Sequence, residues 1–116
     1  MSSPHHSPRH GYRNVRIAHA VAELFVTDLL PALEDPVLQD LRLVNVEVRS
    51  LACIHVWLGP QASAPSHEPH RIEYALSRVE RRLRMELAES LRLKRMPMLR
   101  LKYLPWHPDA RIGGEA

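Results

Sequence analysis

The stretch from Pro69 to Tyr103, "PHRIEYALSRVERRLRMELAESLRLKRMPMLRLKY", decides the fold of this chain. Its first part has apolar residues at steps of three and four, the spacing of one face of an α-helix. Pro69 is tolerated in a first helical turn, whereas Pro97 cannot continue a helix. The pattern predicts a long helix from Pro69 to about Lys94, capped by Ser66. Its buried face should contain Ile72, Ala75, Leu76, Val79, Leu83, Leu87 and Leu91.

Alternation of apolar and polar residues, the period of a half-buried β-strand, predicts three strands. The first runs from Leu41 to Arg49 and the second from Leu51 to Leu58. Because only a few residues around Ser50 separate them, they should form an antiparallel hairpin. We expect their core faces to carry Val44, Val46, Val48, Ala52, Ile54, Val56 and Leu58, and the outer face of the second strand to carry Cys53, His55 and Trp57. The third strand follows Pro97 and has inward-facing Leu99, Leu101 and Tyr103.

A further helix is predicted from Val15 to Leu33, where apolar residues again recur near the helical period. Asn14 is a suitable N-cap. Pro31 should loosen or kink the last turn, and Pro36 keeps the residue before it out of helical geometry.

The predicted order is therefore helix, strand, strand, helix, strand. The first strand connection is too short for a crossover helix, which excludes a doubly wound parallel sheet. We expect an α+β domain over residues 13–103, with its helices packed on one face of a three-stranded sheet. Residues 1–12 and 104–116 lack apolar periodicity and are expected to be a disordered N-terminal tail and a flexible C-terminal tail.

Composition excludes several classes of protein. The 116 residues suit one domain, and the lone Cys53 permits no disulfide within the chain. No apolar run approaches the roughly 18 residues of a membrane span. His19, His55, His67, His70 and His107 are scattered, and no glycine-rich phosphate loop or nucleophile motif is present. His5, His6 and His10 could hold a metal, but no Cys or carboxylate lies near them in the sequence, and a tail without a metal is the favoured interpretation. We therefore expect a cytoplasmic, monomeric protein that is not an enzyme and has no metal or cofactor.

Basic residues concentrate in the second half of the chain. Residues 78–102 contain nine Lys and Arg against three Glu, whereas residues 1–77 contain six Arg against eight acidic residues. Such a charge distribution indicates an anionic partner.

Two interpretations of the basic helix stay open. It can be a solvated face, in which Glu80–Arg84 and Arg82–Glu86 form ion pairs one turn apart. It can also be a phosphate-binding surface, because the planar guanidinium group suits phosphate and stacks on exposed bases. The second interpretation assigns RNA contacts to Arg78, Arg81, Arg82, Arg84, Arg92, Lys94 and Arg95, with Arg13 and Arg16 as accessory residues.

Three stretches, in order, resemble the ribosome-binding factor A family: "RNVRIAHAVAELFVTDLLPALEDP" (13–36), "VNVEVRSLACIHVWL" (44–58) and "RRLRMELAESLRLKRMPMLRLKY" (81–103). The sharpest part is the pattern R-x-x-L-x-x-x-L-R-L-[KR]-x-x-P-x-L, from Arg84 to Leu99. The resemblance implies a type II KH-like fold. It also implies a cytoplasmic assembly factor, not an enzyme, that binds the small ribosomal subunit and assists 16S rRNA maturation.

The chain departs from the family pattern in three places. Family members usually have an Ala-x-Gly step that kinks the long helix, whereas this chain has Val79, Glu80 and Arg81. We therefore expect a straighter helix than in the relatives. The usual Asp-Pro-Arg ends in Val37 here, and the acidic residue usual after the last strand is replaced by Leu104.

Two other features have alternative interpretations. The basic helix can dock an acidic protein instead of RNA, which would make the chain a protein-interaction module of the same fold. Trp57, predicted to face outward, can stack on a base or be covered by other parts of the chain. His55 lies on the same predicted face and has no assigned role.

Overall fold

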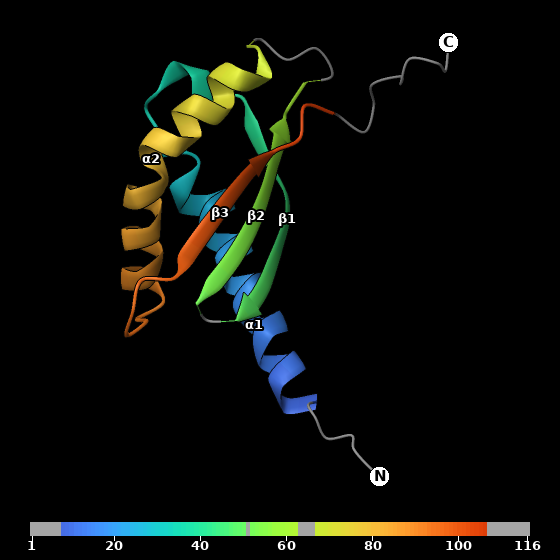
Figure 1. Cartoon of the computed structure of the whole chain (residues 1–116), viewed down its shortest axis with the longest axis vertical. Helices are drawn as coiled ribbons and strands as arrows, with labels where there is room; N and C mark the ends of the chain where they lie inside the picture. Colours follow the sequence, from blue (N-terminus) through green and yellow to red (C-terminus); the bar gives the residue numbers. More distant parts are fainter. Residues whose placement is uncertain (1–7, 51, 63–66, 107–116) are drawn as a thin grey trace, which may run out of the picture.

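The computed structural model describes residues 8–50, 52–62 and 67–106 of the chain. Most of the two predicted tails lies outside these residues, as does Ser66. Two helices and three strands follow one another in the predicted order (Figure 1): α1 (Pro8–Leu24), β1 (Leu41–Ser50), β2 (Cys53–Pro60), α2 (Pro69–Ser90) and β3 (Met98–Tyr103).

The strands form one mixed sheet with β2 at its centre. β1 and β2 are antiparallel, which confirms the predicted hairpin. β2 and β3 are parallel, because α2 returns the chain across the sheet between them, as a parallel pair requires. The predicted α+β class is confirmed.

One apolar core lies between the two helices and one face of the sheet. The buried residues come from all five elements and from the turn that follows α1, and they include Val21, Phe25, Val48, Ile54, Val56, Leu58, Leu76, Leu83, Leu87 and Leu99. Since strand side chains alternate between faces, the residues between these core positions on β2 and β3 lie on the opposite face of the sheet. In the part of the chain that the structure describes, no helix is long and apolar enough to cross a membrane.

α1 differs from its predicted bounds at both ends. It begins at Pro8 rather than Val15, so Asn14 lies inside the helix and not at its N-cap. Its first turns extend beyond the sheet (Figure 1), and residues 8–12 have no apolar periodicity from which a helix could be predicted. After Leu24 the chain makes one wider π-helical turn, in which the Leu30 N–H donates to the Phe25 carbonyl at 2.9 Å. Pro31 then ends the helix, since it has no N–H to donate.

β1 contains a bulge that reverses its alternation. The pairing passes from Leu43–Leu58 directly to Asn45–Trp57, which leaves Val44 unpaired and 38% exposed. A bulge adds one residue to a strand and changes the side on which the neighbouring side chains lie. The prediction that Val44 faces the core is therefore wrong, and Leu43 packs against the core in its place. The inward prediction for Ala52 is also wrong, because this exposed residue precedes β2.

The predicted start of α2 at Pro69 is confirmed, with Glu68 at the N-cap. The predicted end near Lys94 is wrong: the helix ends at Ser90. The cause is the left-handed backbone of Arg92, with φ 54°, a conformation that no helix continues.

α2 is bent although residues 79–81 contain no glycine, whereas the prediction was a helix straighter than in the relatives. Figure 1 shows its first half, in yellow, and its second half, in orange, running in different directions. Ser77 donates its hydroxyl to the Tyr74 carbonyl at 2.7 Å, and hydrogen bonds of this kind bend helices. This bond favours a bend in α2 without a glycine.

Candidate nucleic-acid interface

Two segments far apart in the sequence together form a basic groove. One is the start of α1, and the other is the segment that follows α2. Together with Ala52, which precedes β2, they line a groove of about 730 Å³ with Arg13, Arg92, Leu93, Lys94, Arg95 and Met96. An adjoining hollow shares Arg13, Arg92 and Leu93 and adds Arg16. We call the surface formed by Arg13, Arg16, Arg92, Lys94 and Arg95 the basic groove.

The five cations of the basic groove are exposed to solvent. Within residues 8–50, 52–62 and 67–106, no carboxylate forms an ion pair with Arg92, Lys94 or Arg95. These three charges are thus not neutralised by described acidic groups, and the groove suits an anion.

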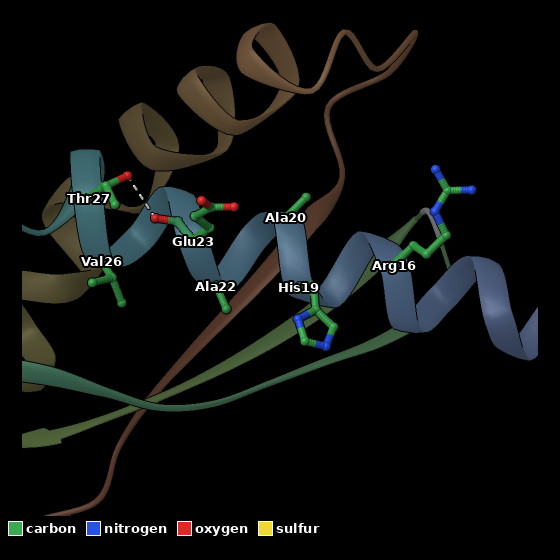
Figure 2. A pocket seen from close by; sticks show the side chains of 7 residues that line it. All are labelled: Arg16, His19, Ala20, Ala22, Glu23, Val26 and Thr27. Atoms are coloured by element: carbon green, nitrogen blue, oxygen red, sulfur yellow. Dashed lines mark hydrogen bonds between the residues drawn. The ribbon is translucent and has the colours of Figure 1, made fainter.

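A shallow hollow extends from the groove along α1 (Figure 2). Arg16 lines both the groove's adjoining hollow and this one. His19 follows along the helix, and Glu23 and Thr27 lie toward the other end, where the Thr27 hydroxyl donates to the Glu23 carbonyl at 2.8 Å. A polyanion is therefore favoured at the Arg16 end and opposed at the Glu23 end.

A C-terminal helix cap places Arg92 in the groove. The Arg92 N–H donates to the Glu89 carbonyl at 3.2 Å, and the Leu93 N–H donates to the Ala88 carbonyl at 2.8 Å. This pair of bonds is a Schellman motif, in which the residue with left-handed backbone is usually glycine. Here it is Arg92, at φ 54°. The motif fixes the direction in which the chain leaves α2 and therefore the position of Lys94 and Arg95.

Arg84 makes a structural contact and does not line the basic groove. It is half-buried, and its Nε donates to the Pro97 carbonyl at 2.9 Å. Pro97 is itself buried. The bond ties α2 to the entrance of β3, and so holds the intervening basic segment in place.

The other arginines predicted on α2 lie apart from those lining the groove. Arg82 pairs with Glu86 at 3.3 Å, as predicted for a solvated helix face. The Arg78 guanidinium lies 5.9 Å from the centre of the Tyr74 ring, and Arg81 is exposed. The seven residues predicted from sequence thus divide into three in the groove, three on the α2 surface and Arg84.

Sequence reasoning assigned no role to Arg100 and Lys102. Both are exposed on β3, in register with His55 and Trp57 of β2. The alternation of basic and apolar residues in β3 was the signal for this placement. Arg100 and Lys102 lie beside His55 and Trp57 because β2 and β3 pair in parallel.

The described residues contain no cluster of three or more His, Cys, Asp or Glu side chains that could hold a metal ion.

The order helix, strand, strand, helix, strand, with both helices on one face of the sheet, defines a type II KH-like protein, a class of module that binds RNA. No family model matches the chain, and no curated protein matches it. Solved structures do match. The crystal structure of ribosome-binding factor A from Thermus thermophilus is 32% identical, with 84% of this chain and 96% of that chain covered and a TM-score of 0.55.

A second match is a Thermus thermophilus ribosome-binding factor A homology model, fitted into the cryo-EM map of a complex with the 30S subunit. It is 32% identical over 83% of this chain and 93% of that chain, with a TM-score of 0.51. The chain belongs to the ribosome-binding factor A family.

Proposed function

We propose that this protein is a ribosome assembly factor that binds the small ribosomal subunit and assists the maturation of 16S rRNA. Membership of the family supports the proposal, as does a relative that was fitted into a complex with the 30S subunit. The observation that carries it in this chain is the basic groove, in which Arg13 meets Arg92, Lys94 and Arg95.

In this proposal the groove holds a segment of the rRNA backbone. Arginine offers a planar fork of donors that binds phosphate through two hydrogen bonds, whereas Lys94 contributes a point charge. Recognition then depends on the shape and backbone of the RNA more than on its sequence. Arg78, Arg81 and Arg82 would extend the contact along α2, and Arg84 would support the groove through Pro97.

We further propose that the protein acts by binding and not by catalysis, and that it is a monomer. We also propose a cytoplasmic location, since its proposed partner is the small ribosomal subunit.

Charge reversal tests the groove directly. The variants Arg92→Glu and Lys94→Glu should each weaken binding to purified small subunits by tenfold or more. The control is Arg71→Glu, which makes the same change of charge at an exposed position of α2 outside the groove. Binding is measured by co-sedimentation, and folding by circular dichroism. Unchanged binding of folded Arg92→Glu and Lys94→Glu variants would show that the groove does not contact the subunit.

An acidic protein partner is the other candidate, because a row of cations suits either kind of anion. Binding to 16S rRNA freed of protein separates the two. RNA contact predicts that the Arg92→Glu variant loses affinity for the naked rRNA as it does for the subunit. If the wild-type protein binds subunits after ribonuclease digestion and ignores naked rRNA, the groove docks a protein.

A further inference from the structure

The face of the sheet opposite the core forms two rows of side chains that cross all three strands. The pairing places Asn45, Trp57 and Lys102 in one row, and Glu47, His55 and Arg100 in the next. Paired residues lie on the same face of a sheet, and Val56, which alternates with these positions on β2, is fully buried on the other face. We call this surface, formed by the two rows, the open sheet face.

Two aromatic rings occupy the centre of the open sheet face. The His55 and Trp57 rings are stacked, with their centres 5.7 Å apart and their planes at 25°. Both residues are only half-buried. A stacked pair holds each ring in a fixed orientation, so the exposed part of the rings is a ready surface for a further planar group.

The charged residues beside the rings differ between β3 and β1. On β3, Arg100 and Lys102 are exposed next to His55 and Trp57. On β1, the one carboxylate of the two rows, Glu47, pairs with Arg49 at 3.5 Å. The positive side of the open sheet face is therefore the β3 side.

Two further carboxylates limit where an anion can lie. Trp57, Arg100 and Lys102 also line a hollow at the edge of β3, together with Glu73 and Glu80 of α2. These acidic groups oppose a phosphate at that edge. They favour a position above the sheet, over the rings and the ends of the two basic side chains.

We propose that the open sheet face binds single-stranded RNA, with a base stacked on the Trp57–His55 pair and its phosphates beside Arg100 and Lys102. Aromatic side chains on a sheet bind unpaired bases because every base has a planar face, and neighbouring cations hold the backbone. A duplex is excluded, since its bases are already stacked. The inference extends the proposed function, because it assigns a second RNA segment to a surface formed by different residues from those of the basic groove.

The test uses the fluorescence of Trp57 as a local probe. Trp106 is the second tryptophan of the chain, and the variant Trp106→Phe leaves Trp57 as the sole indole reporter. This protein is titrated with an oligoadenylate of about ten nucleotides, within the usual length bound by single-strand modules. Stacking predicts saturable quenching of Trp57, and a duplex of equal length should give none.

Charge variants then locate the phosphates. In the Trp106→Phe protein, Arg100→Glu and Lys102→Glu should each weaken the quenching titration about tenfold, whereas Arg71→Glu, an exposed position outside both surfaces, should leave it within about twofold. In the wild-type protein, Trp57→Leu should weaken binding of the labelled oligonucleotide by about tenfold, in line with the loss of one stacked base. Circular dichroism checks that each variant folds.

Two results would overturn the inference: an oligonucleotide that binds without quenching Trp57, or quenching that Arg100→Glu and Lys102→Glu leave unchanged. The test of the open sheet face and the test of the proposed function can fail independently. If the groove variants bind subunits normally while Trp57 is still quenched, the groove assignment fails and the open sheet face stands. If instead the groove variants lose subunit binding and Trp57 is not quenched, the groove assignment stands and the open sheet face does not bind RNA.

Discussion

At the scale of single residues, Arg92 combines an unfavourable backbone with a favourable charge. A residue with a β-carbon in the left-handed region costs about 1–2 kcal/mol, and glycine avoids most of this cost. A glycine at this helix cap would be the stable choice. The presence of an exposed arginine instead is consistent with a role in binding.

The variant Arg92→Gly separates stability from binding. We expect its free energy of unfolding to rise by about 0.5–1 kcal/mol, because the strain at φ 54° is relieved. Its affinity for small subunits should fall, because one groove charge is lost. Urea unfolding and co-sedimentation measure the two effects. Arg92→Lys is the control, since it keeps both the strain and the charge, and a less stable Arg92→Gly variant would refute the account of the cap.

Tyr103 shows a different local feature, a buried hydroxyl with no hydrogen-bond partner among the described atoms. A buried unpaired polar group has lost its hydration without compensation. The variant Tyr103→Phe should therefore be as stable as the wild type, or more stable by up to about 1 kcal/mol. Thermal unfolding at neutral pH measures this, and a loss of more than 1 kcal/mol would mean that the hydroxyl has a partner.

Alkaline pH should destabilise the fold through the same residue. Burial raises the pKa of Tyr103 above its ordinary value of 10.0, and the charge of Asp40 raises it further. The unfolded chain thus loses the proton first as pH rises through about 10, so the free energy of unfolding falls there and is unaffected below. Comparing urea unfolding of wild type and Tyr103→Phe at pH 8 and above pH 10 isolates this contribution, which Tyr103→Phe should lack.

At the scale of elements, Arg84 joins α2 to the entrance of β3. Replacing it with leucine leaves the Pro97 carbonyl without its donor, and we expect a loss of about 1 kcal/mol in the free energy of unfolding. Arg81→Leu is the matched control, because Arg81 is exposed on the same helix and should change stability by less than about 0.5 kcal/mol. Equal stability of the two variants would show that Arg84 has no structural role.

The sequence predicted the order of the helices and strands, but not all of their bounds, nor the bulge in β1. Periodicity identifies a helix or strand where one face is buried, and all five elements have such a face. It misses the first turns of α1, which extend beyond the sheet, and the bulge at Val44, where the local sequence still alternates. The prediction for α2 considered glycine alone, and it did not consider the side-chain hydrogen bond that Ser77 makes to the backbone.

At the scale of the whole molecule, the candidate site depends on contacts that no local pattern contains. The charge count predicted a basic second half and included Arg92, Lys94 and Arg95. It could not show that these lie beside Arg13, from the opposite end of the chain, nor that Arg84 donates to the Pro97 carbonyl. The outward position of Trp57 was predictable from alternation, but its basic neighbours Arg100 and Lys102 follow from the sheet topology.

The salt dependence of subunit binding is the measurement that tests the groove most directly. If its five cations each neutralise a phosphate, the groove contributes about −4 to −5 to the slope of the logarithm of the binding constant against the logarithm of salt concentration. The double variant Arg92→Gln and Lys94→Gln removes two charges, and its slope should be shallower than that of the wild type by about 2. The same slope for both proteins would contradict the account, because the groove would then release no counterions when the subunit binds.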